Sequence, residues 1–158
     1  VDDNGVHCLY VRLRGARAAV DAACRRLGGE LMPDVASDWT ASRDQQLPWF
    51  TERGGRDLWR LSVPQTAPVL DLPDAPYIEW HGAQRWVRAA PSQGERLRRV
   101  AREAGGHASL FIAGQDGGVA RGQRLEPLRA PLDRIHRDLK REFDPAGILN
   151  PGRLYPGL

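Results

Sequence analysis

The apolar positions of this chain follow two periods, and the shorter one predicts β-strands. Five short segments alternate apolar with polar residues, or gather β-branched and aromatic residues, between glycine, proline or polar positions. The predicted strands are residues 6–13, 58–63, 77–80, 84–88 and 107–112. The third and fourth flank His81-Gly82-Ala83, which is typical of a hairpin turn, so these two strands are predicted to pair antiparallel.

Apolar residues at helical spacing predict three helices, at residues 16–27, 92–104 and 131–143. Their apolar stripes are Ala16, Val20, Ala23, Cys24 and Leu27; Leu97, Val100, Ala101 and Ala104; and Leu132, Ile135, Leu139 and Phe143. Ser92, with Glu95 three positions later, predicts a capping box for the second helix. Residues 33–55 fit no single pattern, although 42–46 is compatible with a short helix. Four prolines in residues 64–76 predict an extended connector.

The order of these elements predicts an α+β fold. Apart from one added strand, it is the β-α-β-β-α-β order of the ferredoxin-like unit. In that unit an antiparallel sheet carries its helices on one face and leaves the other face open. We expect residues 1–130 to form this domain. Residues 131–158 are expected to add a helix, ended by Asp144-Pro145, and an extended tail.

Strand alternation assigns side chains to the two faces of the predicted sheet. The face beneath the helices is expected to carry Trp59, Leu61, Val63, Ala108, Leu110 and Ile112. The open face is expected to carry Arg60, Tyr77, Glu79, Trp86, Arg88, His107 and Phe111. Aromatic residues mixed with arginine and a carboxylate are typical of a ligand or domain interface. The alternative is a partly solvated sheet, and a one-residue slip of the hairpin would exchange the two sets.

Composition narrows the class of protein. With 158 residues, 41% of them hydrophobic and 27% charged, the chain resembles a soluble globular domain with a real core. No apolar run approaches the roughly eighteen residues that a membrane span needs. The net charge of +3 comes from interleaved acids and bases, which argues against nucleic acid binding. Because the first residue is Val1 rather than methionine, we expect a fragment. The two cysteines, expected to be reduced, favour a cytoplasmic protein.

Cysteine and histidine patterns indicate no metal centre. Cys8 and Cys24 fall among apolar neighbours in a predicted strand and helix, so they are expected to be buried, reduced thiols. The chain has no Cys-x-x-Cys, and its four histidines show no metal-ligand spacing. The glycine-rich residues 114–126 are expected to be a mobile loop, because they lack the strand and helix that flank nucleotide-binding glycines.

Three segments carry motifs of a known family. They are residues 58–68 (LWRLSVPQTAP), residues 78–86 (IEWHGAQRW) and residues 144–155 (DPAGILNPGRLY). On these motifs the chain resembles the FAD-binding E subunits of glycolate oxidases, which are FAD-linked oxidases of the vanillyl-alcohol-oxidase type. It departs from the pattern at His81, where glycine is usual. The first fifty residues carry little of this resemblance.

The resemblance implies the C-terminal cap domain of an FAD-dependent 2-hydroxy-acid (glycolate) oxidoreductase. It implies that an N-terminal domain absent from this chain binds most of the FAD. The open sheet face would then cover the flavin ring with the substrate between them. Electrons would pass to an iron–sulfur partner subunit, and partner subunits would give the enzyme a peripheral place on the inner membrane. The fragment alone is expected to be inactive, and its open face also predicts a homodimer.

Two alternative functions stay open at this stage. The first is an enzyme of the same flavoprotein group that oxidises D-lactate or another alcohol. The second, from a different class, is a stand-alone ferredoxin-like module for protein interaction or ligand sensing. The sequence upstream of Val1 would separate them, because only an enzyme would carry the glycine pattern of a flavin domain there.

Five residues are the candidates for chemistry. Arg60 is expected to clamp the substrate carboxylate, together with Glu79 as its catalytic neighbour; the alternative is an ion pair between the two. Trp86 is expected at the flavin edge or in the domain interface, with the interface favoured. Asn150 and Arg153 are placed to reach the cofactor through the tail, although Asn150 is also typical of tight turns.

Two further residues of the predicted hairpin have weaker claims. Arg85 has the same two interpretations as Arg60, and the structural one is favoured because alternation places it beside Trp80. His81, at the turn, is a less favoured candidate for a proton acceptor, the role that histidine commonly takes near neutral pH. No nucleophile–base pair stands out, as expected where a cofactor supplies the chemistry.

Overall fold

The computed structural model describes residues 6–114, 124–155 and 157–158. The chain divides into two compact units, Val1–Thr40 and Ala41–Leu158. The glycine-rich loop predicted at 114–126 falls mostly outside the described residues. The predicted division into residues 1–130 and 131–158 stays a prediction.

The first unit contains a helix but no strand among its described residues. Helix α1 (Arg17–Leu27) confirms the predicted helix, and α2 (Ala36–Arg43) begins in this unit. The prediction of a strand over residues 6–13 is wrong, since they have no regular secondary structure and Val6, Leu9, Tyr10 and Val11 are more than half exposed. A strand needs a neighbour for its backbone hydrogen bonds, so β-propensity alone does not form one.

The described part of the first unit buries none of its side chains. The stripe of α1 therefore lacks a core beneath it, contrary to expectation. Cys8 is exposed and Cys24 is half-buried, and both are free thiols. The prediction of a buried Cys8 is wrong because its strand does not form. The guanidinium of Arg12 lies over the indole of Trp39, 5.0 Å from the ring centroid.

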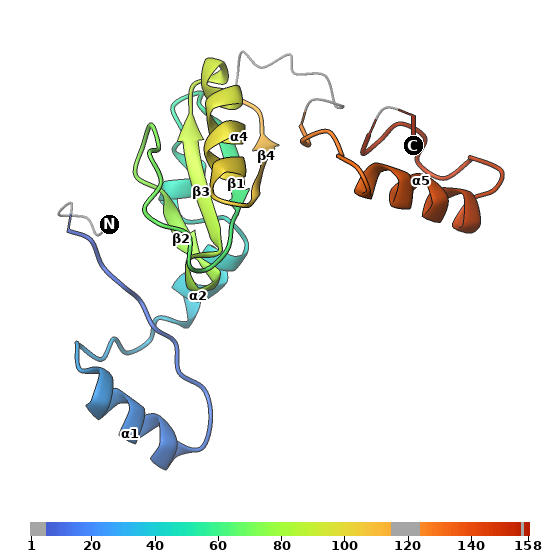
Figure 1. Cartoon of the computed structure of the whole chain (residues 1–158). Helices are drawn as coiled ribbons and strands as arrows, with labels where there is room; N and C mark the ends of the chain where they lie inside the picture. Colours follow the sequence, from blue (N-terminus) through green and yellow to red (C-terminus); the bar gives the residue numbers. More distant parts are fainter. Residues whose placement is uncertain (1–5, 115–123, 156) are drawn as a thin grey trace. The chain divides into compact units, whose positions relative to one another are not determined.

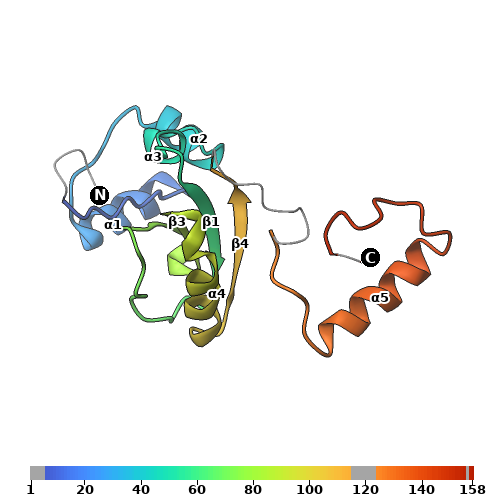
Figure 2. The same cartoon turned by 90° about the horizontal axis from the view of Figure 1, so that it is seen from above.

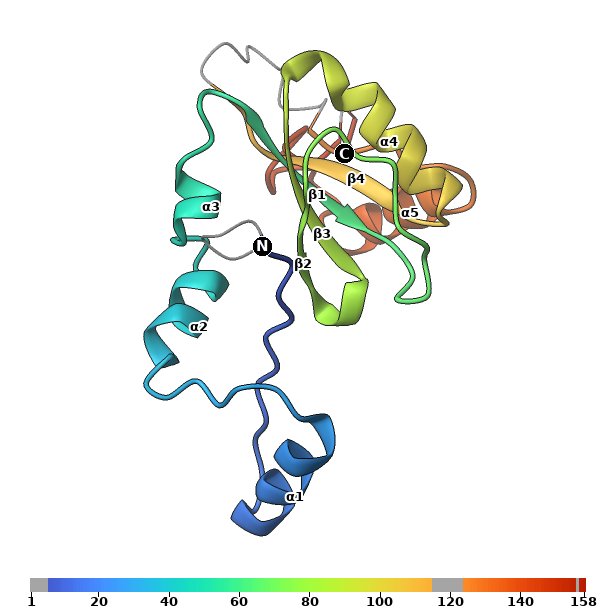
Figure 3. The same cartoon turned by 90° about the vertical axis from the view of Figure 1, so that its left-hand side faces the viewer.

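The second unit contains a four-stranded sheet with helices around it (Figure 1, Figure 3). Its elements are α3 (Pro48–Thr51), β1 (Asp57–Ser62), β2 (Tyr77–Glu79), the 3-10 turn η1 (Trp80–Gly82), β3 (Gln84–Ala89), the 3-10 turn η2 (Pro91–Gln93), α4 (Gly94–Glu103), β4 (His107–Ile112) and α5 (Leu132–Phe143). The strands predicted here are confirmed to within two residues at their ends. The prediction of a capping box at Ser92 is wrong, because Ser92 lies within η2 and α4 begins without a side-chain cap.

The sheet has the strand order β2-β3-β1-β4, and all its neighbouring strands are antiparallel. The α+β class is thereby confirmed. A hairpin that turns at Gly82-Ala83 was expected to pair Glu79 with Trp86. In the structure Tyr77 is paired with Trp86 and Glu79 with Gln84, a shift of two positions. A shift of two keeps every side chain on its predicted face.

The described residues do not show helices on one face only, so the ferredoxin-like detail of the prediction is not confirmed. Residues 63–76, between β1 and β2, contain no helix, because prolines interrupt them. Helix α4 covers one face of the sheet, whereas α3 packs on the opposite face (Figure 3). The predicted open face is therefore partly covered.

Two apolar clusters on opposite faces of β1 make up the core. The cluster beneath α4 contains Trp59, Leu61, Val63, Val87, Ala89, Leu97, Ala101, Ala108 and Leu110. The cluster beneath α3 contains Phe50, Leu58 and Trp86, with Ile112 packed against it. Ile112 was expected beneath α4, but a shift in the pairing of β4 with β1 places it on the α3 side instead. Figure 2 shows α4 running along the sheet from a second direction.

Helix α5 confirms the predicted helix but not its burial. Leu132, Ile135, Leu139 and Phe143 are 46–80% exposed, and α5 buries none of its residues. The described tail residues after Phe143 form no helix or strand, as predicted. None of the helices in the described residues is long and apolar enough to cross a membrane.

Candidate functional site

Aromatic side chains gather on the face of the sheet opposite α4. Trp49 and Phe50 come from α3, Tyr77 from β2, Trp86 from β3 and Phe111 from β4, with ring centroids of successive neighbours 4.9–5.6 Å apart. Trp86 is only 2% exposed, because Phe50 and Phe111 both meet it edge-on. Trp86 is therefore a core residue of this unit, and its expected place at a flavin edge or in a domain interface stays a prediction.

Glu79 is the centre of a hydrogen-bond network at the margin of this aromatic cluster. Its carboxylate accepts hydrogen bonds from the indole N–H of Trp86 at 2.7 Å, the side-chain amide of Gln84 at 3.0 Å and the hydroxyl of Ser42 at 3.2 Å. The Ser42 hydroxyl also lies 2.9 Å from that of Tyr77. These contacts join α2 to the hairpin, so the arrangement favours a structural role for Glu79 over a catalytic one.

Arg60 lies at the centre of the same face. In the sheet it is paired with Trp86 of β3 and Ser109 of β4. Its side chain is half-buried, and its guanidinium is 5.9 Å from the ring centroid of Phe111. Among the described residues Arg60 makes no hydrogen bond or ion pair, so the alternative pairing with Glu79 does not occur. The five N–H donors of the guanidinium remain available to a ligand.

The other arginines of the sheet are committed to the fold. Arg88 lies 3.3 Å from the Asp74 carboxylate and 4.8 Å from the ring centroid of Trp49. Arg85 donates hydrogen bonds to the carbonyls of Gly82, Ala67 and Pro68 at 2.8–3.1 Å. Burial lowers the pKa of Arg85, although guanidinium groups stay charged in proteins.

The Ala-Gln-Arg-Trp motif thus encodes structure rather than chemistry. Gln84 and Trp86 bind Glu79, while Arg85 fastens the proline-rich connector to the hairpin turn. The structural interpretation of Arg85 fits this geometry. Sequence spacing gave no sign of these bonds, because the acceptors on the connector lie 17 and 18 residues away from Arg85.

The turn of the hairpin explains why glycine is usual at the position of His81. Trp80 and His81 have φ of 53° and 54°, in the left-handed region that non-glycine residues adopt at a cost of about 1–2 kcal/mol. Both side chains are exposed, and Gly82 follows with φ of 90°. His81 therefore occupies a conformation suited to glycine, and no described contact orients it as a proton acceptor.

Asn150 and Arg153 lie together in the tail. Asn150 has φ of 48°, which asparagine tolerates, and its carbonyl accepts the backbone N–H of Arg153 at 3.1 Å. Both side chains are exposed. The turn interpretation of Asn150 fits this geometry, and Arg153 stays a candidate for contact with a cofactor.

The tail is fastened to α5 through Asp144. The Asp144 carboxylate is buried, binds the ammonium of Lys140, and accepts the backbone N–H groups of Ile148 and Leu149 at 3.0 and 2.9 Å. The hydrogen bond from Lys140, with help from these amides, holds the pKa of Asp144 below its ordinary value. Asp144 thus gives the family tail its shape.

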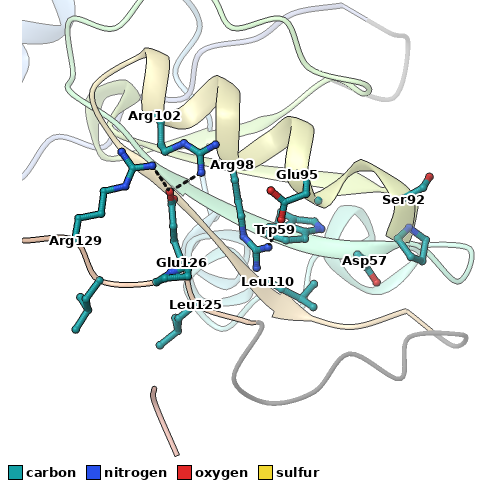
Figure 4. A pocket seen from close by; sticks show the side chains of 14 residues that line it. Asp57, Trp59, Ser92, Glu95, Arg98, Arg102, Leu110, Leu125, Glu126 and Arg129 are labelled. Atoms are coloured by element: carbon teal, nitrogen blue, oxygen red, sulfur yellow. Dashed lines mark hydrogen bonds and ion pairs between the residues drawn. The ribbon is translucent and has the colours of Figure 1, made fainter. Parts of the chain in front are cut away.

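A separate cavity of about 590 Å³ lies beside α4 (Figure 4). Its lining includes Trp59 and Leu110 of the sheet and charged side chains that pair with each other. Arg102 lies 2.8 Å and Arg129 3.9 Å from the carboxylate of Glu126. None of the five candidate residues lines this cavity. Its charges are balanced internally, so it indicates no ligand class.

Sequence reasoning missed Asp57, the buried carboxylate at the start of β1. Asp57 is 1% exposed and accepts the backbone N–H of Gly114 at 2.7 Å. An aspartate opening a strand gives no signal that distinguishes it from a surface residue. In the described residues no three His, Cys, Asp or Glu side chains gather as metal ligands.

Comparison with known proteins supplies the relationship. Neither a family model nor a solved structure matches the chain. The chain is 46% identical over 153 residues to the glycolate oxidase subunit GlcE of Escherichia coli (strain K12). This chain is similar to a glycolate oxidase subunit. The resemblance indicated by the three motifs is confirmed, and the match covers 96% of the chain, far more than the motifs do.

The match covers a smaller share of GlcE than of this chain. The chain spans 40% of the length of the E. coli subunit, which is consistent with one domain of a longer protein.

Proposed function

We propose that this chain is the C-terminal cap domain of the FAD-binding subunit of a glycolate oxidase. The observation that carries the proposal is the 46% identity to GlcE over nearly the whole chain. Arg60 supports it, as an arginine without a partner among the described residues on a face rich in aromatic side chains. The substrate class would be 2-hydroxy acids, and this chain alone would be inactive.

FAD would be held mainly by a domain outside this chain. The described residues contain no glycine-rich turn leading from a strand into a helix, which is the usual cradle for a pyrophosphate. When bound, the flavin would accept the hydride that the substrate loses. Among the candidate residues, Asn150 and Arg153 are exposed, Arg60 and Glu79 are half-buried, and Trp86 is enclosed. The Glu79 carboxylate already accepts three hydrogen bonds, whereas Arg60 makes none among the described residues.

The role of Arg60 would be to bind and orient the substrate. A planar guanidinium can hold a carboxylate through two parallel hydrogen bonds, which fixes the position of the carbon next to it. The surrounding aromatic side chains would exclude water and strengthen this attraction. Glu79 would act by holding Trp86 in place beside Arg60 rather than by transferring a proton.

The last residues would join the cap to the rest of the subunit. Four exposed apolar side chains of α5 and the exposed Ile148, Leu149 and Leu154 of the tail form apolar surface that requires a cover. We assign residues 131–158 to contact with the N-terminal FAD-binding domain. Other oxidase subunits, one of them an iron–sulfur protein, would complete a cytoplasmic complex at the inner membrane. A homodimer through the sheet face stays a prediction.

A chimaeric enzyme tests the proposal. The matched segment of E. coli GlcE is replaced by this chain, and flavin content and glycolate-dependent dye reduction are measured in the assembled oxidase. Retained flavin with glycolate oxidation is expected. A folded chimaera that binds no flavin would overturn the assignment. A chimaera that binds flavin but oxidises only D-lactate or another alcohol would show that glycolate is not the substrate.

The Arg60→Ala chimaera tests the site itself. A hydrogen bond to a charged group contributes about 1.5–3 kcal/mol to binding. Its loss in Arg60→Ala is expected to raise the KM for glycolate roughly 10- to 100-fold. Arg96→Ala is the matched control, because Arg96 pairs on the surface with Asp71 at 2.8 Å. If the Arg60→Ala enzyme has the same KM for glycolate as this control, Arg60 does not bind the substrate.

A further inference from the structure

Strand β4 contains an irregularity beside Arg60. Leu58 of β1 is paired with Ile112, but the next residue, Trp59, is paired with Leu110, so Phe111 has no partner across the strands. This is a β-bulge, in which two residues of one strand face one residue of the other. Bulges are common next to active sites, where they redirect a side chain.

The bulge separates the roles of two apolar neighbours. Ile112 turns toward Phe50 and Leu58 and fills the core on the α3 side. Phe111 stays on the outside, 41% exposed, with its ring edge-on to Trp86 at 4.9 Å between centroids. The Phe111 ring is also the aromatic group that the Arg60 guanidinium faces, at 5.9 Å. A half-exposed phenylalanine beside an unpaired arginine is not needed to fill the core.

We propose that Phe111 determines which 2-hydroxy acids the enzyme accepts, by limiting the size of the substituent on carbon 2. The inference rests on the proposed function, in which Arg60 holds the carboxylate. A carboxylate bound to the guanidinium would bring carbon 2 close to Arg60, and the Phe111 ring, 5.9 Å from the guanidinium, is within reach of a substituent on that carbon. Glycolate carries only hydrogen atoms beside the hydroxyl on carbon 2 and would fit, whereas a longer side chain would meet the ring.

The edge-to-face contact with Trp86 gives the ring the rigidity that a size filter needs. Trp86 is itself held by Phe50 and by its hydrogen bond to Glu79. The backbone carbonyl of Phe111 accepts a hydrogen bond of 3.1 Å from Arg124, which fixes the bulge from its outer side. A filter built on a bulged strand position can change size without disturbing the ladder around it.

The test compares two substrates in the chimaeric enzyme. kcat/KM is measured for glycolate and for 2-hydroxybutyrate, whose ethyl group extends from carbon 2. Phe111→Ala is expected to raise the 2-hydroxybutyrate-to-glycolate ratio by about tenfold or more, since one methylene is worth roughly 10- to 200-fold in a fitted pocket. Phe111→Trp should lower the ratio. Val69→Ala, at a 98% exposed position, is the control and should leave it unchanged.

The outcomes separate this inference from the proposal on which it rests. If Arg60→Ala raises KM for both substrates but Phe111→Ala lowers both kcat/KM values by one common factor, Phe111 only covers Trp86 and the inference is wrong. If Arg60→Ala changes neither KM, the carboxylate assignment fails first. Should Phe111→Ala fail to fold, Phe111→Leu keeps the apolar cover, and an unchanged ratio in both Phe111→Leu and Phe111→Trp overturns the filter.

Discussion

The indole N–H of Trp86 donates a hydrogen bond of 2.7 Å to the carboxylate of Glu79. Both residues belong to the motif segment 78–86, and they face the same side of adjacent strands. The bond gives the buried donor of Trp86 its acceptor, while the ring closes the α3 cluster. Glu79 and Trp86, both candidate site residues in the sequence, thus contribute first to the structure of this unit.

Replacing Glu79 separates its structural role from a catalytic one. Glu79→Ala should lower the free energy of unfolding by about 1–3 kcal/mol, because Trp86 keeps a buried N–H without an acceptor. Glu79→Gln keeps a carbonyl acceptor and should cost less. Urea unfolding of the chain measures both, with Glu103→Ala on the exposed side of α4 as control. In the chimaera, a stable but inactive Glu79→Gln enzyme would restore the catalytic assignment.

Arg85 should prove essential to the fold of the second unit and not to its chemistry. Arg85→Ala removes hydrogen bonds to three carbonyls and should destabilise the unit by about 2–4 kcal/mol. Arg85→Lys should rescue little, since an ammonium cannot reproduce the planar fork. Thermal unfolding measures this. Equal stability of the Lys variant and the parent chain would contradict the clamp.

Gly106 is needed because two backbone segments touch there. A Cβ at this position would overlap the backbone carbonyl of Ser62, and backbone cannot move aside cheaply. Gly106→Ala should therefore lower the free energy of unfolding by about 1–3 kcal/mol. Ala104→Gly, at the end of α4, is a useful contrast because it removes volume instead. An unfolding midpoint for Gly106→Ala equal to that of the parent would show that β1 and β4 can separate locally.

Acid should loosen the tail from α5. The folded-state pKa of Asp144 lies below its ordinary value, so its ionised form favours the folded tail. This contribution is complete above the unfolded pKa of about 4 and is lost as the pH falls through the lowered folded value. Backbone amide signals of Ile148 and Leu149, followed by NMR from pH 6 to pH 2, should shift together with the carboxyl of Asp144. In Asp144→Asn this transition should be absent.

The elements of the fold differ in how well the local sequence predicts them. Strand β1, the hairpin and helices α4 and α5 were predictable, because period-two alternation and helical spacing are local properties. The strand expected over residues 6–13 has equally good propensity and does not form, since a ladder needs a neighbouring strand. The bulge at Phe111 was also invisible, because only pairing with β1 defines it.

The candidate site shows the same division. Arg60 and Arg85 have identical side chains on strands of one sheet, and strand alternation favoured a structural role for Arg85 without naming its partners. The structure supplies them: Arg85 donates hydrogen bonds to three carbonyls on the connector and the turn, whereas Arg60 makes no hydrogen bond or ion pair among the described residues and lies near the ring of Phe111. Residue type predicts that an arginine can bind a carboxylate. Long-range contacts determine which of the two arginines keeps N–H donors that are not already hydrogen-bonded within the fold.

By itself, then, the sequence determined the periodic elements, the parity of the hairpin faces and the relationship to glycolate oxidase subunits, all of which depend on residues close together in the chain. The tertiary structure alone decided that α3 partly covers the second face, that Glu79 accepts the indole N–H of Trp86, and that Arg60 has no hydrogen bond or ion pair among the described residues. The physical reason is that hydrogen-bond partners and burial depend on segments far apart in the chain, such as Ser42 and Glu79 or Asp57 and Gly114, which only the folded sheet brings together.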